Sequence, residues 1–404
     1  MRRSELFVTS SKQSRADTSC RSEELALRAG LVRSYGSGTF GFSHLGHRVL
    51  ENIESVVREE LDGKAQEVRM NVLQSSDIWR KSGRWKNFEG DEFFHLENRD
   101  GKDFTIAATH EEAAVELARD YIRSYRDLDL AFYQIGRKFR DDRARKGLLR
   151  TKEFLMKDAY SFHSDRGSLE QKYDGFLESY RNIFDRLGLD YSVVAADNGS
   201  MGGSRSHEFL AESEVGSDRY LKCRECEYGT KELERSVCES CGSELEEVSG
   251  IEIGHMFELG TRYSDAMDLE FVTESGDSEQ VLMASYGIGV TRLIAAIIEQ
   301  NHDSRGIAWN REVSGFDASI IVARHEDRAL RKAEQLYQKL SSEFDVLLYD
   351  RLSAGEQFAE SDLIGVGKKI VIGNRYLETG KIELEDRSGE TREVDEDQLM
   401  EQLR

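Results

Sequence analysis

Apolar residues recur at helical spacing in three stretches of the first half of the chain. Residues 46–62 place six apolar side chains on one face, Val49, Leu50, Ile53, Val56, Val57 and Leu61. Gly63 follows this stretch as a stop signal. Residues 110–126 and 168–187 show the same period, and the latter opens with Ser168 and Gln171 at the spacing of a capping box. We expect three amphipathic helices.

Short apolar segments between these stretches predict strands of an antiparallel sheet, namely AFYQIGRKF (131–139) and DYSVVAA (190–196). From about residue 317 the rhythm changes to ASIIVA, a helix over 326–343, DVLLYD, KKIVIGN and KIELEDR. This alternation predicts a separate small α/β domain, joined by a linker at 302–315. The expected fold class is α+β, an antiparallel sheet flanked by helices, with a C-terminal α/β domain.

The composition is that of a soluble globular protein of two or three domains. The 404 residues are 33% charged and 38% hydrophobic, and no apolar run approaches the roughly 20 residues of a membrane helix. The first 19 residues contain basic side chains but no apolar central region, which argues against a secretory signal. We expect a cytoplasmic protein without a membrane segment.

Proline is absent from the whole chain. Average usage of about 5% predicts roughly 20 prolines in a chain of this length, and chance would remove them all about once in a billion sequences. The absence therefore reflects selection or design.

A basic stretch stands out in a chain whose net charge is -21. Residues 138–154 (KFRDDRARKGLLRTKEF) hold seven cations against three carboxylates. Taken alone, such a run is more often a solvated charged hairpin than a binding site. A second segment, YGIGVTR (286–292), offers two glycines that let the backbone approach a ligand and an arginine that suits phosphate. Together the two segments favour an anion site.

The combination of a basic loop after F-R, then R-x-x-x-F at Arg150–Phe154, then G-x-G-x-x-R resembles motifs 2 and 3 of class II aminoacyl-tRNA synthetases. The resemblance narrows to bacterial-type prolyl-tRNA synthetases and covers essentially the whole chain. The segments that carry it are THEE (109–112), KFRDD, EFLMKDAYSFH (153–163), GGSRSHEF (202–209), GIEIGHMFELGTRYSDAM (250–267), SYGIGVTRL and AAIIEQNHDSRGIAW (295–309).

The resemblance implies an ATP site. Arg140 would hold the α-phosphate and the amino-acid carboxylate, Arg292 the γ-phosphate, and Phe154 would stack under adenine. Asp142 and Glu252 could orient Mg²⁺ or the adenosine end. The implied catalytic residues are Arg140 and Arg292, and the other implied ATP-binding residues are Asp142, Arg145, Arg150, Phe154, Glu252, His255, Gly287 and Gly289. The loop 142–149 would also approach the acceptor end of the tRNA.

For the amino acid, Thr109 and Glu111 match the T-x-E element of the family, which would bind the secondary amine of proline. Thr109 with Glu112 is also a capping box, and both interpretations can hold. The resemblance adds Arg140 and four further pocket residues, Asp158, Tyr160, His163 and His207, with Phe209 as an apolar wall. For each histidine alone, a structural role is equally expected.

Two C-x-x-C pairs, Cys223/Cys226 and Cys238/Cys241, have the spacing of a tetrahedral structural Zn²⁺ ribbon. The alternative is a set of reduced thiols at the ends of a deletion, because many bacterial relatives carry a large editing domain between such cysteines. Cys20 is a lone thiol without an evident role.

The C-terminal region LLYDRLSAGEQFAESDLIGVGKKIVIG (347–373) resembles the anticodon-binding domain of the family. Asp350, Arg351 and Phe358 are candidates for contacting anticodon bases, and an ordinary turn is the alternative. The expected domains are a catalytic part at 1–222, a short cysteine insertion at 223–249, the rest of the catalytic domain with the linker at 250–314, and the anticodon-binding domain at 315–404.

The chain departs from the family at positions where relatives tend to carry proline. Asn71 replaces the characteristic proline of motif 1 at the dimer interface, and the others are His44, Ser75, Ala108, Ala144, Asn310, Gly315 and Gly367.

The resemblance implies a homodimeric proline–tRNA ligase that charges the proline-specific tRNA and has no editing domain of its own. One alternative is a non-catalytic tRNA-binding or regulatory module, which would not need Arg140, Phe154 and Arg292 together. A threonine, serine or glycine synthetase is disfavoured by the T-x-E element.

Overall fold

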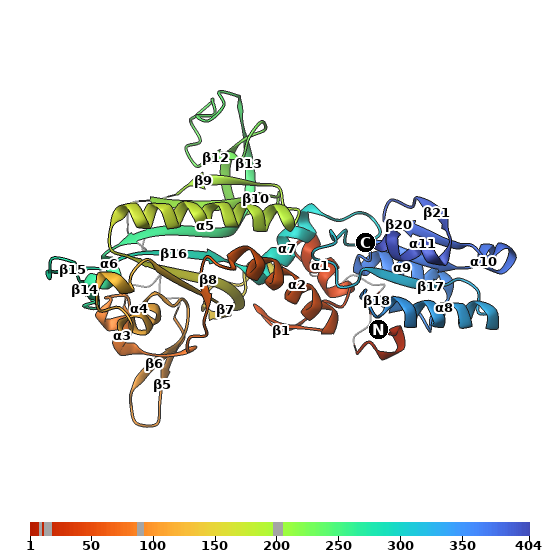
Figure 1. Ribbon diagram of the computed structural model, residues 1–404, viewed down its shortest axis with the longest axis horizontal. Helices are drawn as coiled ribbons and strands as arrows, with labels where there is room; N and C mark the ends of the chain where they lie inside the picture. Colours follow the sequence, from red (N-terminus) through yellow and green to blue (C-terminus); the bar gives the residue numbers. More distant parts are fainter. Residues whose placement is uncertain (8–9, 12–17, 87–92, 197–204) are drawn as a thin grey trace. The chain divides into compact units, whose positions relative to one another are not determined.

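A computed structural model describes residues 1–7, 10–11, 18–86, 93–196 and 205–404 (Figure 1). The chain forms two compact units. The larger comprises Gly36–Thr39 and Glu54–Ala296, and the smaller comprises Met1–Tyr35, Phe40–Ile53 and Ile297–Arg404. Within the described ranges, no helix is long and apolar enough to cross a membrane.

The larger unit is built on a nine-stranded sheet. Its spatial order is β10 (Arg205–Glu212), β9 (Tyr191–Ala195), β12 (Tyr228–Thr230), β11 (Asp218–Cys223), β13 (Leu245–Gly260), β16 (Leu282–Ile288), β8 (Glu153–His163), β7 (Leu130–Phe139) and β3 (Gln66–Glu67). The central pairs β13–β16, β16–β8 and β8–β7 are antiparallel, as are β10–β9 and β10–β13. The expected antiparallel sheet is confirmed.

Helix α5 (Arg166–Arg186) covers one face of this sheet, and the ring of Phe176 stacks on Tyr286 at 3.9 Å between centroids. The helix begins earlier than predicted. Asp165 is its N-cap, and its Oδ1 accepts the backbone N–H of Ser168 at 3.0 Å. The predicted cap at Ser168 is wrong, because a carboxylate three residues upstream satisfies that N–H.

Helix α4 (Glu111–Arg119) packs on the opposite face, where Ala114, Val115 and Ala118 join a buried cluster with Phe132 and Phe162. Around it lie α3 (Ser76–Lys81), α6 (Arg262–Ala266) and two small sheets, β4 (Leu73–Ser75), β6 (Asp103–Ile106) and β5 (His95–Glu97), and β14 (Glu270–Val272) with β15 (Ser278–Gln280).

The predicted helix over 110–126 is wrong in its last turns, because α4 ends at Arg119. Asp127 Oδ2 accepts the backbone N–H groups of Arg123 and Ser124 and favours a separate short turn, η2 (Tyr125–Asp127). Local side-chain bonds of this kind compete with helix continuation.

The smaller unit contains a five-stranded sheet in the order β18 (Val346–Leu348), β17 (Ala318–Val322), β19 (Lys368–Ile372), β20 (Ile382–Asp386) and β21 (Thr391–Val394). The first three strands are parallel and the last two are antiparallel additions. Its helices are α8 (Asp327–Leu340), α9 (Ala354–Ile364), α10 (Asn374–Thr379) and α11 (Glu396–Leu403). The expected C-terminal α/β domain is confirmed.

The first residues of the chain belong to this smaller unit. The Met1 amine donates to the Val346 carbonyl at 2.7 Å, and the Leu348 N–H donates to the Met1 carbonyl at 2.9 Å. The unit also contains η1 (Arg3–Glu5), α1 (Arg21–Arg28) and the strands β1 (Val32–Gly36) and β2 (Thr39–Phe42), whose ends reach the unit boundary. The predicted scheme, with a catalytic part at 1–222, stays a prediction. Hydrophobic pattern does not reveal which distant strand a short terminal segment joins.

Helices α2 (His44–Leu61) and α7 (Val290–Gln300) each run across a boundary between the units in sequence. Helix α2 agrees with the helix predicted over 46–62 and buries Val49, Ile53 and Val57. Helix α7 follows directly after the G-x-G segment and carries Arg292 in its first turn.

Candidate active site

The β7–β8 hairpin carries the basic loop. The two strands pair from Leu130 opposite Phe162 to Phe139 opposite Glu153, and the Arg140 N–H continues the ladder to the Lys152 carbonyl at 2.9 Å. Because side chains alternate along a strand and paired residues share a face, the even-numbered positions of both strands point toward the α4 side. The hairpin therefore places Arg140, Phe154, Asp158 and Tyr160 on one face.

Arg140 lies at the end of β7, with its guanidinium carbon 5.5 Å from the Phe154 ring centroid. Its Nε donates to the Ala108 carbonyl at 3.3 Å. This bond ties the cation to the segment that leads into α4. An arginine held in this way can meet an anion between the loop and the sheet.

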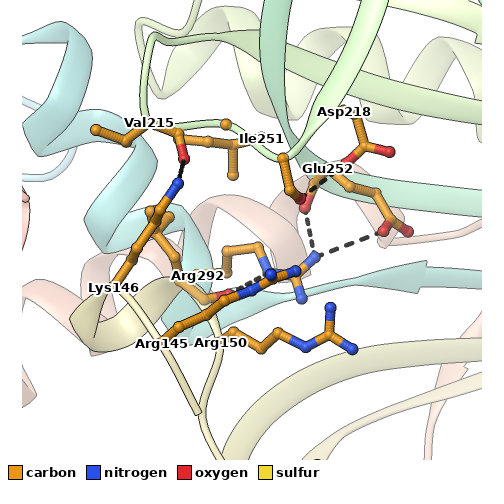
Figure 2. Close-up of a pocket in the computed structure, with 11 residues that line it drawn as sticks. Arg145, Lys146, Arg150, Val215, Asp218, Ile251, Glu252 and Arg292 are labelled. Atoms are coloured by element: carbon orange, nitrogen blue, oxygen red, sulfur yellow. Dashed lines mark hydrogen bonds and ion pairs between the residues drawn. The ribbon is translucent and has the colours of Figure 1, made fainter. Parts of the chain in front are cut away.

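A cavity of about 220 Å³ lies between the basic loop, β13 and the start of α7 (Figure 2). Arg292 Nε donates to the Leu149 carbonyl at 3.0 Å, and its Nη1 donates to the Glu252 carbonyl at 2.7 Å. These two bonds fix the guanidinium at the cavity wall, and no hydrogen bond of Nη2 is found among the residues that the structure describes. The cavity is lined by Arg145, Lys146, Leu149, Arg150, Val215, Gly216, Ser217, Asp218, Ile251, Glu252 and Arg292.

Cations outnumber carboxylates in this cavity. Glu252 Oε2 lies 3.7 Å from Arg292 Nη1, and Glu252 Oε1 lies 3.2 Å from His255 Nδ1. Desolvation opposes ionisation of Glu252, but the bond with His255 and the charges of Arg292 and Arg140 lower its pKa to about 2. A permanently charged carboxylate thus holds one cation, while the excess positive charge suits a polyphosphate.

Arg150 forms an ion pair with Asp142 across the loop. The Arg145 N–H donates to the Arg150 carbonyl at 3.1 Å. The predicted cations Arg145, Arg150 and Arg292 are therefore brought together around one cavity, with Asp142 and Glu252 as their counter-charges.

The two glycines of the G-x-G segment have different surroundings. Gly287 pairs with Asp158 on one side and His255 on the other, so any side chain there would project onto the site face. At Gly289 a Cβ would lie 3.3 Å from the Cβ of Arg292 and crowd that arginine. Both positions thus keep the face beside Arg292 open.

Thr109, Glu111, Asp158 and Tyr160 meet at the start of α4. Thr109 Oγ1 donates to Glu111 Oε2 at 2.6 Å. The Tyr160 hydroxyl accepts the His110 N–H at 3.2 Å and donates to Asp158 Oδ2 at 2.9 Å. This corner is next to Arg140 through Ala108. It can hold a small cation beside a carboxylate.

The predicted capping box of Thr109 and Glu112 is wrong. His110 is the N-cap residue of α4 and makes no side-chain cap bond. The Glu112 carboxylate accepts from Ser82 Oγ at 2.6 Å and from Arg84 instead. A buried guanidinium is a stronger partner for this carboxylate than a backbone N–H.

Two neighbours of Asp158 were missed by the sequence analysis. Lys138 Nζ donates to Asp158 Oδ1 at 2.6 Å, and Gln134 Nε2 donates to Oδ2 at 3.1 Å. Desolvation opposes the charge of Asp158, but Lys138 and His110 keep its pKa below the usual range. Lys138 could have been found, because it lies two residues before Arg140 on one strand and must share its face.

The structure does not bring His163 and His207 to this corner. His207 pairs with Met256, which pairs with Tyr286, and this row lies on the α5 face. His207 Nδ1 lies 2.9 Å from the Tyr173 hydroxyl of α5, and His163 Nδ1 lies 3.2 Å from Ser168 Oγ. Burial lowers the pKa of each histidine to about 4. Both are neutral structural groups on the far face.

Two other predicted features lie elsewhere. Phe209 is fully buried among the aromatic rings of Tyr180, Phe184 and Tyr191 under α5, so it is not a wall of the corner. Of the segment predicted at 202–209, residues 202–204 lie outside the described residues.

The anticodon candidates belong to the smaller unit. Asp350 Oδ1 accepts the Ser4 N–H at 2.9 Å, Arg351 is exposed, and Phe358 is half-buried in α9. Asp350 is thus already engaged by the N-terminal segment, while Arg351 remains accessible.

The four cysteines form the single group of three or more potential metal ligands among the residues that the structure describes. Their ligand atoms all lie within 4.8 Å of one another. The Sγ separations are 3.5 Å for Cys223–Cys241, 3.6 Å for Cys226–Cys238 and 3.7 Å for Cys226–Cys241. The group could hold a metal ion.

Residues 94–301 match the tRNA synthetase class II core domain (G, H, P, S and T), and residues 317–404 match the anticodon binding domain. The proline–tRNA ligase of Sulfurimonas denitrificans is 40% identical over 96% of this chain and 95% of its own length. The chain belongs to the prolyl-tRNA synthetase family. The ligase of Maricaulis maris is 38% identical over all of this chain and 98% of its own length.

Other members of the family clarify size and fold. The proline–tRNA ligase of Halothermothrix orenii is 31% identical over an alignment of 540 residues, covering 95% of each protein, although this chain has 404 residues. That relative therefore contains sequence that this prolyl-tRNA synthetase chain lacks. A prolyl-tRNA synthetase structure from Cryptosporidium parvum has the same fold, with a TM-score of 0.78 at 18% identity over 95% of this chain and 75% of its own.

Proposed function

We propose that this protein is a proline–tRNA ligase with ATP, proline and the proline-specific tRNA as substrates. A carboxylate oxygen of proline would attack the α-phosphorus of ATP, giving prolyl-adenylate and pyrophosphate. A hydroxyl of the 3′-terminal ribose of the tRNA would then attack the prolyl carbonyl and release AMP. The observation that carries the proposal is the convergence of Arg140, Phe154 and Arg292 on one sheet face in a member of this family.

In this proposal ATP lies along the site face. Phe154 would stack under adenine, and Arg140 would contact the α-phosphate and the proline carboxylate. Negative charge grows there as phosphorus is attacked, so a pre-positioned guanidinium favours the transition state. Arg292 Nη2 would contact the γ-phosphate, with Arg145 and Arg150 beside it. Mg²⁺ would be held with the phosphates through one or two carboxylates, for which Asp142 and Glu252 are the candidates.

Proline would bind at the corner formed by Thr109, Glu111, Asp158 and Tyr160. Glu111 is 3% exposed and lies beside Thr109, which supports a dry site for the cationic secondary amine. Asp158 and Tyr160 would shape the pocket, and Lys138 and Gln134 would fix Asp158. We leave His163 and His207 out of this pocket because their side chains face α5.

Pyrophosphate exchange with each of the twenty amino acids tests the proposal. We expect strong exchange with proline and weak exchange with alanine, because losing methylene-sized contacts discriminates only about 10–200-fold. Without an editing domain in this chain, alanyl-tRNA is expected to persist once formed. A chain that exchanges with threonine, serine or glycine, or with no amino acid, would be a different synthetase or a binding module.

The four cysteines are proposed to bind one structural Zn²⁺. With zinc–sulfur bonds of about 2.3 Å, sulfur atoms at the corners of a tetrahedron are about 3.8 Å apart, close to the observed separations. The Glu225 N–H also points to Cys223 Sγ at 3.4 Å, which suits a thiolate. The bound ion would link the end of β11 to the segment before β13, and it would take no part in the reaction.

Metal analysis of the purified protein should find about one zinc per chain. Cys226→Ser should lose the zinc and lower the melting temperature, because ligation contributes folding free energy. Cys20→Ser, which changes a cysteine outside the group, is the matched control. A zinc-free protein whose stability is the same in the parent and in Cys226→Ser would favour reduced thiols.

We further propose that the smaller unit reads the anticodon and that the enzyme is a homodimer. The match of residues 317–404 to the anticodon binding domain supports the first statement, with Arg351 and Phe358 as the accessible candidates for base contacts. The loop 142–149, rich in arginine, would meet the acceptor end of the tRNA.

A further inference from the structure

A buried arginine supports the carboxylate that we assign to the proline amine. Arg84 is 4% exposed and follows α3, and its Nη1 donates to Glu111 Oε2 at 3.1 Å and to both oxygens of Glu112 at 3.2 Å. Glu111 and Glu112 are adjacent in the first turn of α4 and are 3% and 0% exposed. One guanidinium therefore joins two carboxylates in the interior.

Aromatic rings enclose this cluster. The guanidinium carbon of Arg84 lies 5.1 Å from the Trp79 ring centroid and 5.5 Å from that of Tyr263. Low solvent access strengthens the electrostatic interactions between the charged groups. Burial opposes the charge of Arg84, but Glu112, Tyr263 and Glu111 raise its pKa above the usual range, so it stays protonated.

The contacts of Glu111 all end on one oxygen. Thr109 Oγ1 and Arg84 Nη1 both donate to Oε2, and no contact of Oε1 is found among the described residues. Two donors thus hold Oε2, and Oε1 is the oxygen of Glu111 that can accept from a further donor. A cationic secondary amine is the ligand that such an oxygen favours.

Glu112 sets the charge of the cluster. Arg84 and Glu111 alone would be neutral together and would attract a cation weakly. Adding Glu112, which Ser82 Oγ also holds at 2.6 Å, gives these three side chains two negative charges against one positive charge. Burial raises the pKa of Glu112 above its usual range, and Arg84 offsets only part of this rise.

We propose that Arg84 and Glu112 are positioning residues that orient Glu111 and give its surroundings the negative charge that binds the amine of proline. This inference rests on the proposed function, because it takes Glu111 as the partner of that amine. Neither residue touches the substrate. Both act on proline affinity through Glu111, and ATP affinity is independent of them.

Glu112→Gln and Arg84→Lys test the inference in the full-length protein by steady-state pyrophosphate exchange. Glutamine keeps the shape of Glu112 but removes its charge, and lysine keeps the charge of Arg84 but cannot bridge two carboxylates in the same way. Each should raise the KM for proline about 10-fold, with the KM for ATP and kcat within about two-fold of the parent. Glu116→Gln, on the same helix and with a side chain that is 36% exposed, should change none of these values.

The outcomes separate two failures. If Glu111→Gln raises the KM for proline but neither Glu112→Gln nor Arg84→Lys does, the positioning role is wrong and the proposed function stands. If Glu111→Gln leaves the KM for proline unchanged, the assignment of the amine to Glu111 is wrong. Equal increases in the KM for ATP and for proline would show a general structural role, and would also overturn the inference.

Discussion

Replacing Arg292 with alanine is expected to lower proline-dependent pyrophosphate exchange by at least about 100-fold. Its guanidinium is held by the carbonyls of Leu149 and Glu252, so its position is fixed before any ligand arrives. A pre-positioned donor contributes most where negative charge grows, because no reorganisation accompanies the reaction. Arg140→Ala should lower the exchange by a similar factor, because it would remove the proposed partner of the α-phosphate. The measurement is exchange of labelled pyrophosphate into ATP at saturating proline.

The fold should survive both substitutions. Arg181→Ala is the matched control, because Arg181 is an arginine of α5 whose side chain pairs with Glu227 at the surface, away from the site face. It should exchange within about two-fold of the parent. Circular dichroism of all three variants should match the parent. Near-normal exchange by a folded Arg292→Ala or Arg140→Ala protein would remove that arginine from the ATP site.

Strand periodicity explains which parts of the site could be predicted. Residues 131–139 and 153–163 form paired strands, and their register alone puts Arg140, Asp158 and Tyr160 on one face. The same rule excludes His163, which is an odd number of residues from Asp158. Alternation over the whole segment 153–163 therefore assigns this histidine to the opposite face from the sequence alone.

Contacts between distant segments explain what was missed. Arg84 follows α3 and Glu111 begins α4, 27 residues later, so no local pattern links them. The Met1 amine donates to the Val346 carbonyl, 345 residues away in the sequence, and the first segment therefore belongs to the smaller unit. Helix caps failed for a different reason, because Asp165 competes with Ser168, and Arg84 competes with the backbone for Glu112. In each case two groups compete for the same hydrogen-bond partner, and the sequence pattern does not show which of them binds it.

The absence of proline has a direct consequence for the proposed reaction. A chain without proline is translated without prolyl-tRNA, the product that this enzyme would make. Translation of the parent should therefore continue in a system depleted of prolyl-tRNA, whereas a variant with one restored proline should stall there. Without proline at a compatible turn, the unfolded chain has more conformational freedom. This lowers the free energy of unfolding by about 0.4–1 kcal/mol for each such site.

Restoring proline at Gly367 and at Asn71 is expected to raise the melting temperature by about 1–4 °C each, additively, without changing the choice of amino acid. Gly367 follows α9, and a Cβ there would meet nothing within 4 Å. Asn71 is exposed, and the backbone N–H groups of both residues are absent from the hydrogen bonds of the described chain. Proline at Gly315 should raise the melting temperature less than proline at Gly367, because a Cβ there would lie 2.9 Å from Leu45 Cδ1. Scanning calorimetry measures the effect.

Gly365→Pro is the matched control, two residues before Gly367. Gly365 has a φ of +85°, which proline cannot adopt, and its N–H donates to the Asp362 carbonyl at 3.2 Å. This variant should lose about 3 kcal/mol or more of unfolding free energy, while Gly367→Pro gains. If Gly367→Pro and Asn71→Pro both leave the melting temperature unchanged or lower it, then neighbouring residues have already adapted to the missing prolines. Proline would then have been lost gradually, with compensation at each turn, rather than removed from a chain otherwise unchanged.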